Sequence, residues 1–168
     1  MTEEPTPRVV AVNRGTEQAA GQGPGRRPQH DALEAWVGRW INTGHMIDDD
    51  GNAGATITTS DVYAWAPGGF FIVHSAYGRI GEFDVGGTEV IGWDESRGHY
   101  TSHFFDSRGN VTVSSLTARG DTWTYQGDTT RSTVEFSDDH RVQTVLHERM
   151  DDAAIYRPSM KVTLLKIE

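Results

Sequence analysis

The residues with the clearest chemical potential lie in the segment HYTSHFFDSRGN, residues 99–110. Two histidines stand four positions apart, and Asp106 follows three positions after the second. Histidine titrates near neutral pH and binds metals, so this spacing raises two hypotheses, a metal site and a catalytic His–Asp dyad. On a strand, side chains four residues apart share a face but lie about 13 Å from each other. His99 and His103 are therefore too far apart to share a metal, and His103 and Asp106 face opposite ways.

Asp106 fits a turn better than a catalytic role. The sequence Asp-Ser-Arg-Gly-Asn is typical of a turn in which the aspartate carboxylate accepts backbone N–H groups. On the preceding strand, Asp106 shares a face with Tyr100, Ser102 and Phe104, opposite His103. Whether Tyr100 or His103 faces the interior of the protein is left open by the sequence.

The chain around this segment is typical of an antiparallel β-sheet. Strand-forming Val, Ile, Thr, Tyr, Phe and Trp alternate with turn sequences such as DDDGNAG, APGG and SDDH. Ten strands are predicted, at residues 39–47, 55–65, 69–77, 82–93, 98–106, 110–118, 121–128, 131–137, 140–150 and 159–167. Because a meander hides its edge strands by closing, we predict an all-β fold, a single antiparallel barrel of about 8–10 strands.

Two segments precede the strands. Residues 1–30 are rich in Gly, Pro and Gln, and they are expected to form a disordered tail in front of a barrel domain at residues 31–168. Within HDALEAWVGRW, the spacing of Leu33 and Trp36 predicts a short helix that begins at an Asp31 cap. We expect this helix to close one end of the barrel, with Trp36 and Trp40 as its plug.

Several of these motifs resemble a known superfamily. The helix followed by Gly38-Arg-Trp40 resembles the N-terminal signature of the calycins, the lipocalin-like barrels. The segments WAPGGFF and GWDESRGHY are similar to those of an uncharacterised bacterial family of small calycin-like barrels. The matching residues are Trp65, Gly68, Gly69, Phe71, Gly92, Trp93, Asp94, Tyr100, Asp106, Ser107 and Gly109. The resemblance implies a calycin-like barrel over roughly residues 33–168, and no activity, because that family has none in common.

A more distant resemblance is to the nitrobindin-like proteins, which implies haem binding through a histidine on the last strand. Here the last strand, within PSMKVTLLKIE, contains no histidine, and Met160 is its only soft ligand. Haem binding is therefore disfavoured, and we expect no cofactor and no metal site.

The composition excludes several other classes of function. The chain of 168 residues carries a net charge of −9, so neither a nucleic acid nor an anionic membrane is an expected partner. The absence of cysteine excludes disulfides and thiolate catalysis. No apolar run reaches the roughly 18 residues of a membrane-spanning helix, and the N-terminus lacks the apolar region of a secretory signal. We expect a cytoplasmic monomer or homodimer whose partner is a small molecule.

Two functions fit a barrel of this kind. The first is the binding of a small hydrophobic or aromatic molecule in the barrel cavity. The residues expected to contact it are Trp65, Phe71, Trp93, Phe104, Trp123 and Tyr125. The alternative is a cofactor-free enzyme, a cyclase, isomerase or lyase of the kind used in natural-product biosynthesis, with cavity histidines and tyrosines as acid–base groups. The candidates for that role are His74, His103, His147, Tyr77 and Tyr100.

Overall fold

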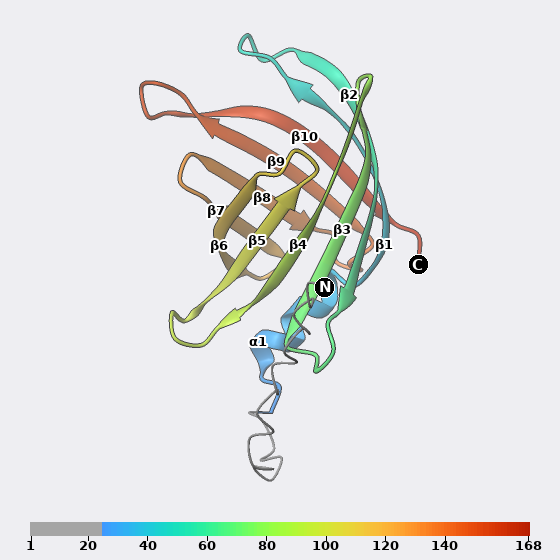
Figure 1. The fold of residues 1–168 in the computed structure, drawn as a ribbon, viewed down its shortest axis with the longest axis vertical. Helices are drawn as coiled ribbons and strands as arrows, with labels where there is room; N and C mark the ends of the chain where they lie inside the picture. Colours follow the sequence, from blue (N-terminus) through green and yellow to red (C-terminus); the bar gives the residue numbers. More distant parts are fainter. Residues whose placement is uncertain (1–24) are drawn as a thin grey trace, which may run out of the picture.

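Each strand of the chain pairs with the strand next to it in the sequence, and the last strand pairs with the first. The computed structural model, which describes residues 25–168, is a closed barrel of ten antiparallel strands in the order β1-β10-β9-β8-β7-β6-β5-β4-β3-β2 (Figure 1). The predicted barrel is confirmed, and its architecture is consistent with a calycin-like barrel. Residues 1–24 of the predicted tail lie outside the described part of the chain.

All ten predicted strands are present, with ends that differ from the prediction by at most three residues. They are β1 (Gly38–Ile47), β2 (Ala53–Trp65), β3 (Phe71–Ile80), β4 (Phe83–Asp94), β5 (His99–Asp106), β6 (Val111–Arg119), β7 (Thr122–Gln126), β8 (Thr130–Phe136), β9 (Val142–Met150) and β10 (Tyr156–Lys166). The turn at Asp106 has the predicted chemistry, because its carboxylate accepts the backbone N–H groups of Arg108 and Asn110 at 2.9 and 2.8 Å.

The helical segment begins earlier than predicted. It consists of α1 (Pro28–Asp31) followed by a 3₁₀ turn, η1 (Ala32–Ala35). The ring Nδ1 of His30 accepts the backbone N–H of Arg27 at 2.9 Å, whereas the Asp31 side chain makes no capping hydrogen bond. The predicted cap at Asp31 is therefore wrong. The N-cap is Arg27, because a proline in the first turn and the His30 contact start the helix four residues sooner. No helix in residues 25–168 is long and apolar enough to span a membrane.

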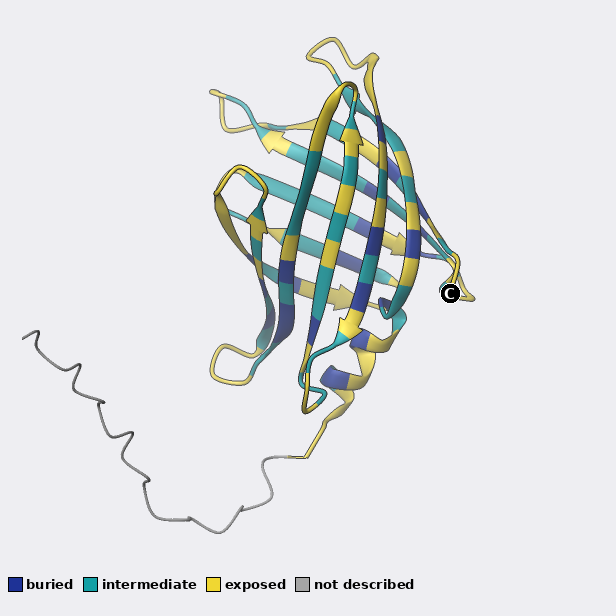
Figure 2. Ribbon diagram, turned by 45° about the vertical axis from the view of Figure 1, so that its right-hand side comes forward, coloured by how far each residue is buried: buried dark blue, intermediate teal, exposed yellow. Residues whose placement is uncertain are grey.

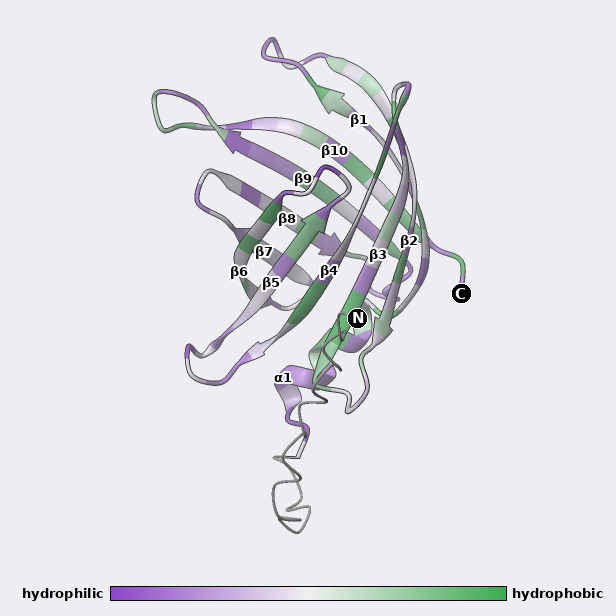
Figure 3. Cartoon of the chain, in the orientation of Figure 1, coloured by the Kyte–Doolittle hydropathy of each residue, from purple (hydrophilic) through white to green (hydrophobic). Residues whose placement is uncertain are grey.

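The helical segment closes one end of the barrel with tryptophan, as predicted. Trp36 is almost completely buried, and its ring meets those of Trp123 and Phe136 edge-on at centroid distances of 5.6 and 5.0 Å. The indole N–H of Trp40 donates to the Trp36 carbonyl at 2.9 Å. Edge-to-face contacts of this kind add to the hydrophobic gain of burying large rings. Figure 2 shows the buried residues concentrated towards this end, and Figure 3 shows the most hydrophobic stretch of β3 beside α1.

Inward-facing side chains change in size along the barrel axis, and this change creates an internal space. Near α1 they are large, and they fill the barrel: Trp40, Tyr63, Ile72, Ile91, Tyr100, Leu116, Trp123 and Phe136. Further along the same strands the inward positions carry small residues: Gly44, Ala76, Ser102, Ser114 and Ser132. Small side chains on a wall of fixed circumference leave the centre of the barrel unfilled.

The outer face of β3 is less covered than the sequence suggests. Its two largely apolar faces predict a strand that is buried on both sides. In the structure, the Phe71 and Tyr77 side chains are 46% and 67% exposed. A single-layer barrel covers only the inner face of each strand, so the outer apolar residues of β3 remain at the surface.

The substitution Trp36→Ala tests the plug. Removing a buried tryptophan leaves a cavity that its rigid aromatic neighbours cannot fill, so the free energy of unfolding should fall by about 3–5 kcal/mol. Phe83→Ala, at a side chain that is 71% exposed, is the matched control and should change it by less than about 0.5 kcal/mol. Urea unfolding followed by circular dichroism measures both. Equal losses in the two variants would contradict the role of Trp36.

Candidate functional site

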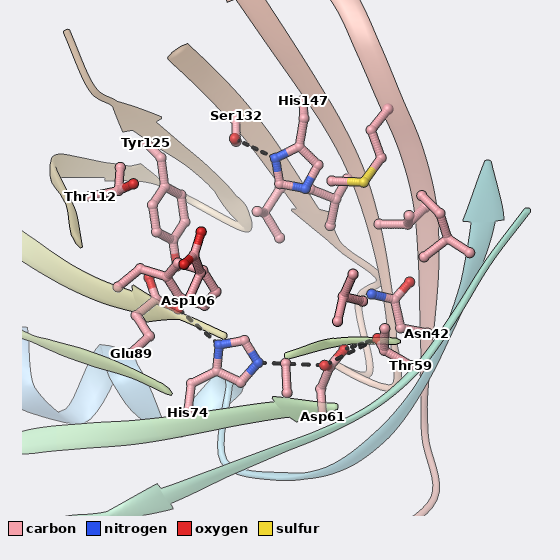
Figure 4. A pocket seen from close by; sticks show the side chains of 18 of the residues that line it. Asn42, Thr59, Asp61, His74, Glu89, Asp106, Thr112, Tyr125, Ser132 and His147 are labelled. Carbon is pink, nitrogen blue, oxygen red and sulfur yellow. Dashed lines mark hydrogen bonds and ion pairs between the residues drawn. The ribbon is translucent and has the colours of Figure 1, made fainter. Parts of the chain in front are cut away.

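The barrel contains a cavity that opens at the end opposite α1. Its volume is about 540 Å³, within the usual range of small-molecule sites. The floor includes Trp36 and Tyr63, and the mouth includes Met46, Arg108 and Arg149 from the hairpins at the open end. The middle of the cavity wall is polar, and this part contains the chemistry (Figure 4).

Three ionisable side chains meet on the wall formed by β2, β3 and β4, and we call Asp61, His74 and Glu89 the charged cluster. The ring Nδ1 of His74 lies 2.8 Å from Glu89 Oε2, and its Nε2 lies 3.6 Å from Asp61 Oδ1. The side chains are 11% (His74), 3% (Asp61) and 9% (Glu89) exposed. His74 and Glu89 are cross-strand partners, and Asp61 lies opposite Ala76, the next inward residue of β3. The antiparallel register thus brings the three side chains together inside the barrel.

Neighbouring side chains fix the orientation of this cluster. The Ser102 hydroxyl donates to Glu89 Oε1, and the Thr59 hydroxyl lies 3.2 Å from both oxygens of Asp61. The ring of Tyr63 stacks on the imidazole of His74 with centroids 3.9 Å apart and an interplanar angle of 6°. The imidazole is therefore held in its plane by stacking and at its Nδ1 by the Glu89 carboxylate. Its Nε2 lies within ion-pair distance of Asp61 but makes no hydrogen bond.

The charged cluster keeps His74 protonated at neutral pH. Burial alone lowers the pKa of His74, because it penalises the charged imidazole. The hydrogen bonds and negative charges of Asp61 and Glu89 outweigh burial and raise the pKa of His74 from 6.5 to about 9. At neutral pH this wall therefore holds a positively charged imidazole between two carboxylates.

The opposite wall carries a second histidine, His147, whose pKa is shifted in the opposite direction to that of His74. His147 on β9 faces its cross-strand partner Ser132 on β8, and the Ser132 Oγ lies 2.6 Å from His147 Nδ1 (Figure 4). Burial lowers the pKa of His147 from 6.5 to about 4, and the charge of Glu89 opposes this shift. His147 is therefore neutral at neutral pH, and a neutral imidazole nitrogen can accept a proton.

Two tyrosines complete the polar lining. Burial, followed by the charge of Glu89, raises the pKa values of Tyr63 and Tyr125 well above 10. Both phenols therefore stay protonated and can donate a hydrogen bond to a bound molecule. Tyr125 stands between the two histidine walls (Figure 4).

Four of the sequence-predicted site residues line the cavity, namely His74, His147, Phe104 and Tyr125. The alternation of β5 settles which way its residues point. Tyr100 faces inward, and its hydroxyl donates to the Gln29 carbonyl at 2.8 Å in the closed end, whereas His103 faces outward and is exposed.

The other predicted residues do not reach the cavity. Tyr77 and Phe71 point outward from β3 because they occupy the positions that alternate with His74. Trp123 is part of the closed-end core, below the cavity. Trp65 and Trp93 pack at the rim of the closed end, where their indole N–H groups donate to Glu34 and Glu95 at 2.8 and 3.0 Å.

Asp61 and Glu89 are the important residues that the sequence reasoning missed. A signal for them exists, because each is the one charged residue in an uncharged stretch of its strand, SDVYAW for Asp61 and GTEVIGW for Glu89. Each also lies in a strand that neighbours the one containing His74. Only the hairpin register, however, shows that all three side chains face inward in two adjacent cross-strand rows.

Metal and haem ligands are not gathered at this site. Within residues 25–168, no group of three or more His, Asp or Glu side chains has a geometry able to hold a metal ion. The cavity-facing residues of β10 are Met160, Val162 and Leu164. A strand with these residues does not fit the histidine-ligated haem that the nitrobindin resemblance implies.

Fold and site together define a class, a small closed antiparallel barrel with a polar cavity open at one end. Residues 26–163 match the family described as protein of unknown function DUF1579, and the chain belongs to this family. A comparison with curated proteins gives no match. The barrel is thus the fold of a family whose description assigns no activity.

The two histidines predict opposite pH dependences of stability. His74 binds its proton more tightly when folded, so its contribution is complete below pH 6.5 and is lost as the pH rises from 6.5 to about 9. His147 binds its proton more weakly when folded, so its contribution is lost as the pH falls from 6.5 to about 4. Each shift corresponds to about 3 kcal/mol.

Urea unfolding over this pH range, in the wild type and in the variants His74→Gln and His147→Gln, measures these contributions. The difference in the free energy of unfolding between the wild type and His74→Gln should become smaller only as the pH rises above 6.5. The corresponding difference between the wild type and His147→Gln should become smaller only as the pH falls below 6.5. Parallel pH profiles in all three proteins would contradict the assigned protonation states.

Proposed function

We propose that this protein binds a small, largely apolar organic molecule inside the barrel cavity. The observation that supports this most strongly is the cavity itself, about 540 Å³ in volume and open at one end. Its wall combines apolar side chains such as Val134 and Val145 with a few fixed polar groups. This combination is typical of small-molecule sites, where apolar contacts supply affinity and polar groups fix orientation.

The small inward residues also support this function. Ser102, Ser114 and Ser132 occupy inward positions where larger apolar residues would pack the barrel solid, as they do near α1. A filled core stabilises a barrel more than a hollow one, because every void loses packing contacts. An open cavity in a stable fold is therefore best explained by a molecule that occupies it.

A cavity-filling substitution tests this function. Ser114→Phe places a ring in the cavity, and Val113→Phe adds the same ring to the outer face one residue away, where Val113 is 50% exposed. The uncharged fluorescent probe N-phenylnaphthylamine should bind the wild type and Val113→Phe equally. Its affinity for Ser114→Phe should fall about tenfold or more, because the ring takes the probe's place. Equal titration curves for all three proteins would contradict binding in the cavity.

One observation favours a second function, acid–base catalysis by a cofactor-free cyclase, isomerase or lyase. The same cavity holds a protonated histidine, His74, and a neutral one, His147, on different walls. Titratable groups whose environments move their pKa values apart are typical of acid–base pairs in enzymes. In this function His147, oriented by Ser132, removes a proton, and the phenol of Tyr125 donates a hydrogen bond to the resulting anion.

Deuterium exchange measures this activity without knowledge of the substrate. The bicyclic ketone α-tetralone has acidic C–H bonds beside its carbonyl, and NMR follows their exchange in D₂O. The wild type should accelerate exchange, and His147→Gln should lower the acceleration by about 10²-fold or more. His103→Gln, at an exposed histidine outside the cavity, should leave it unchanged. Identical exchange with wild type and His147→Gln would contradict a catalytic role for His147.

A further inference from the structure

The charged cluster holds more negative than positive charge. Among residues 25–168, His74 is the one basic side chain in contact with Asp61 or Glu89. A protonated imidazole leaves an excess of one negative charge, and a neutral imidazole leaves an excess of two. The excess is therefore negative in either protonation state.

The rest of the cavity interior does not offset this charge. His147, Tyr63 and Tyr125 line it as neutral groups near pH 7, as derived above from their burial. The charged residues that line the mouth balance one another, since Arg108 and Arg149 are accompanied by Asp106 and Glu148. These mouth residues also adjoin solvent, where salt screens them. An uncompensated charge in a buried site is costly, and a ligand of opposite charge removes that cost.

Unpartnered polar atoms lie in the charged cluster and on the wall next to it, and the ring Nε2 of His74 is one of them. Asn42 is the cross-strand partner of Thr59, whose hydroxyl contacts Asp61 (Figure 4). Its carbonyl Oδ1 is buried and has no hydrogen-bond partner. In the same cross-strand row Gln143 is 1% exposed, lines the cavity, and has an unpartnered Nε2.

Buried polar groups in folded proteins are nearly always hydrogen-bonded, so these atoms indicate a polar ligand group at this wall. The Asn42 oxygen and the Asp61 carboxylate are acceptors, and they call for a donor on the ligand. The unpartnered nitrogens of His74 and Gln143 are donors, and they call for an acceptor atom on the same ligand. A protonated amine supplies several N–H donors and the missing positive charge at once. Gln143 lies two strands from Asn42 along this row, so its donor suits an oxygen atom on another part of the ligand.

Aromatic rings suit the same ligand. Trp36, Tyr63, Phe104 and Tyr125 line the cavity around the charged cluster. The faces of such rings attract organic cations as well as packing against apolar groups. The apolar residues Val134, Val145 and Val162 provide a surface for the remainder of the molecule.

We propose that the ligand of this cavity is an amphipathic amine, an aromatic or otherwise apolar molecule whose protonated nitrogen binds between Asp61 and Asn42. This proposal rests on the proposed binding function, and it names the chemical class of the bound molecule. The cavity selects the amine by charge and by the two acceptors, and it disfavours a carboxylate of the same size.

Three compounds that share one ring system test the proposal: naphthylethylamine, naphthylethanol and naphthylacetate. Their dissociation constants are measured at pH 7 by quenching of tryptophan fluorescence. The wild type should bind the amine about tenfold or more tightly than the alcohol, and the carboxylate more weakly than the alcohol.

The substitution Asp61→Asn should bring the amine and alcohol affinities close to each other, because it removes the excess charge. Asn42→Leu removes the unpartnered acceptor and leaves the charged cluster intact. It therefore tests the proposal even if Asp61→Asn does not fold. It should reduce the preference for the amine severalfold. The control is Asp84→Asn, an exposed aspartate that pairs with Arg79 on the surface, and it should keep the wild-type preference.

The outcomes separate the two proposals. Wild-type protein that binds the alcohol as tightly as the amine would overturn the amine proposal and leave small-molecule binding in place. A preference for the amine that survives in both Asn42→Leu and a folded Asp61→Asn would also overturn it. Wild-type protein that binds none of the three compounds would overturn both proposals.

Discussion

The pairing of β1 with β10 is the constraint on which the rest of the structure depends. It joins the two ends of the meander through seven register positions, from Trp40 opposite Lys166 to Met46 opposite Met160. Closure removes both exposed edges of the sheet, and it forces every second side chain of all ten strands into one enclosed volume. The contents of that volume then follow from the inward residues of each strand. Where these are large the barrel is solid, and where they are small it is hollow.

Closure also makes the charged cluster possible. Two carboxylates and an imidazole are rarely buried together. The free energy needed to remove the charges from water exceeds the attraction gained from one ion pair of imperfect geometry. Here β2, β3 and β4 place them within contact distance. Ser102 and Thr59 contact the carboxylate oxygens and Tyr63 covers the imidazole face, while His74 Nε2 has no hydrogen-bond partner. A packed barrel would be stable without these groups. Their presence in a cavity with unpartnered amides therefore supports a role in binding rather than in stability.

The sequence predicts the fold well and the site only in part. Strand alternation and turn chemistry are local properties, so ten strands and the Asp106 turn follow from short segments. The side-chain direction on β5 also follows once one inward residue is known. The register between strands is different, because it depends on pairing over the whole hairpin. For that reason His74 is recognised as a candidate from the sequence, while its partners Asp61 and Glu89 are not. Tyr77 and Phe71 fail as candidates for a related reason, since an apolar residue on an outer barrel face has the same local pattern as one inside.

A crystal structure of the protein with naphthylethylamine is the decisive test of amine binding at the charged cluster. We expect electron density for the compound inside the barrel, with its nitrogen within hydrogen-bond distance of Asp61 and its rings against Tyr125. Density for the compound only on the outer face of the barrel, or inside it with the nitrogen directed away from Asp61, would show that the charged cluster does not bind the amine.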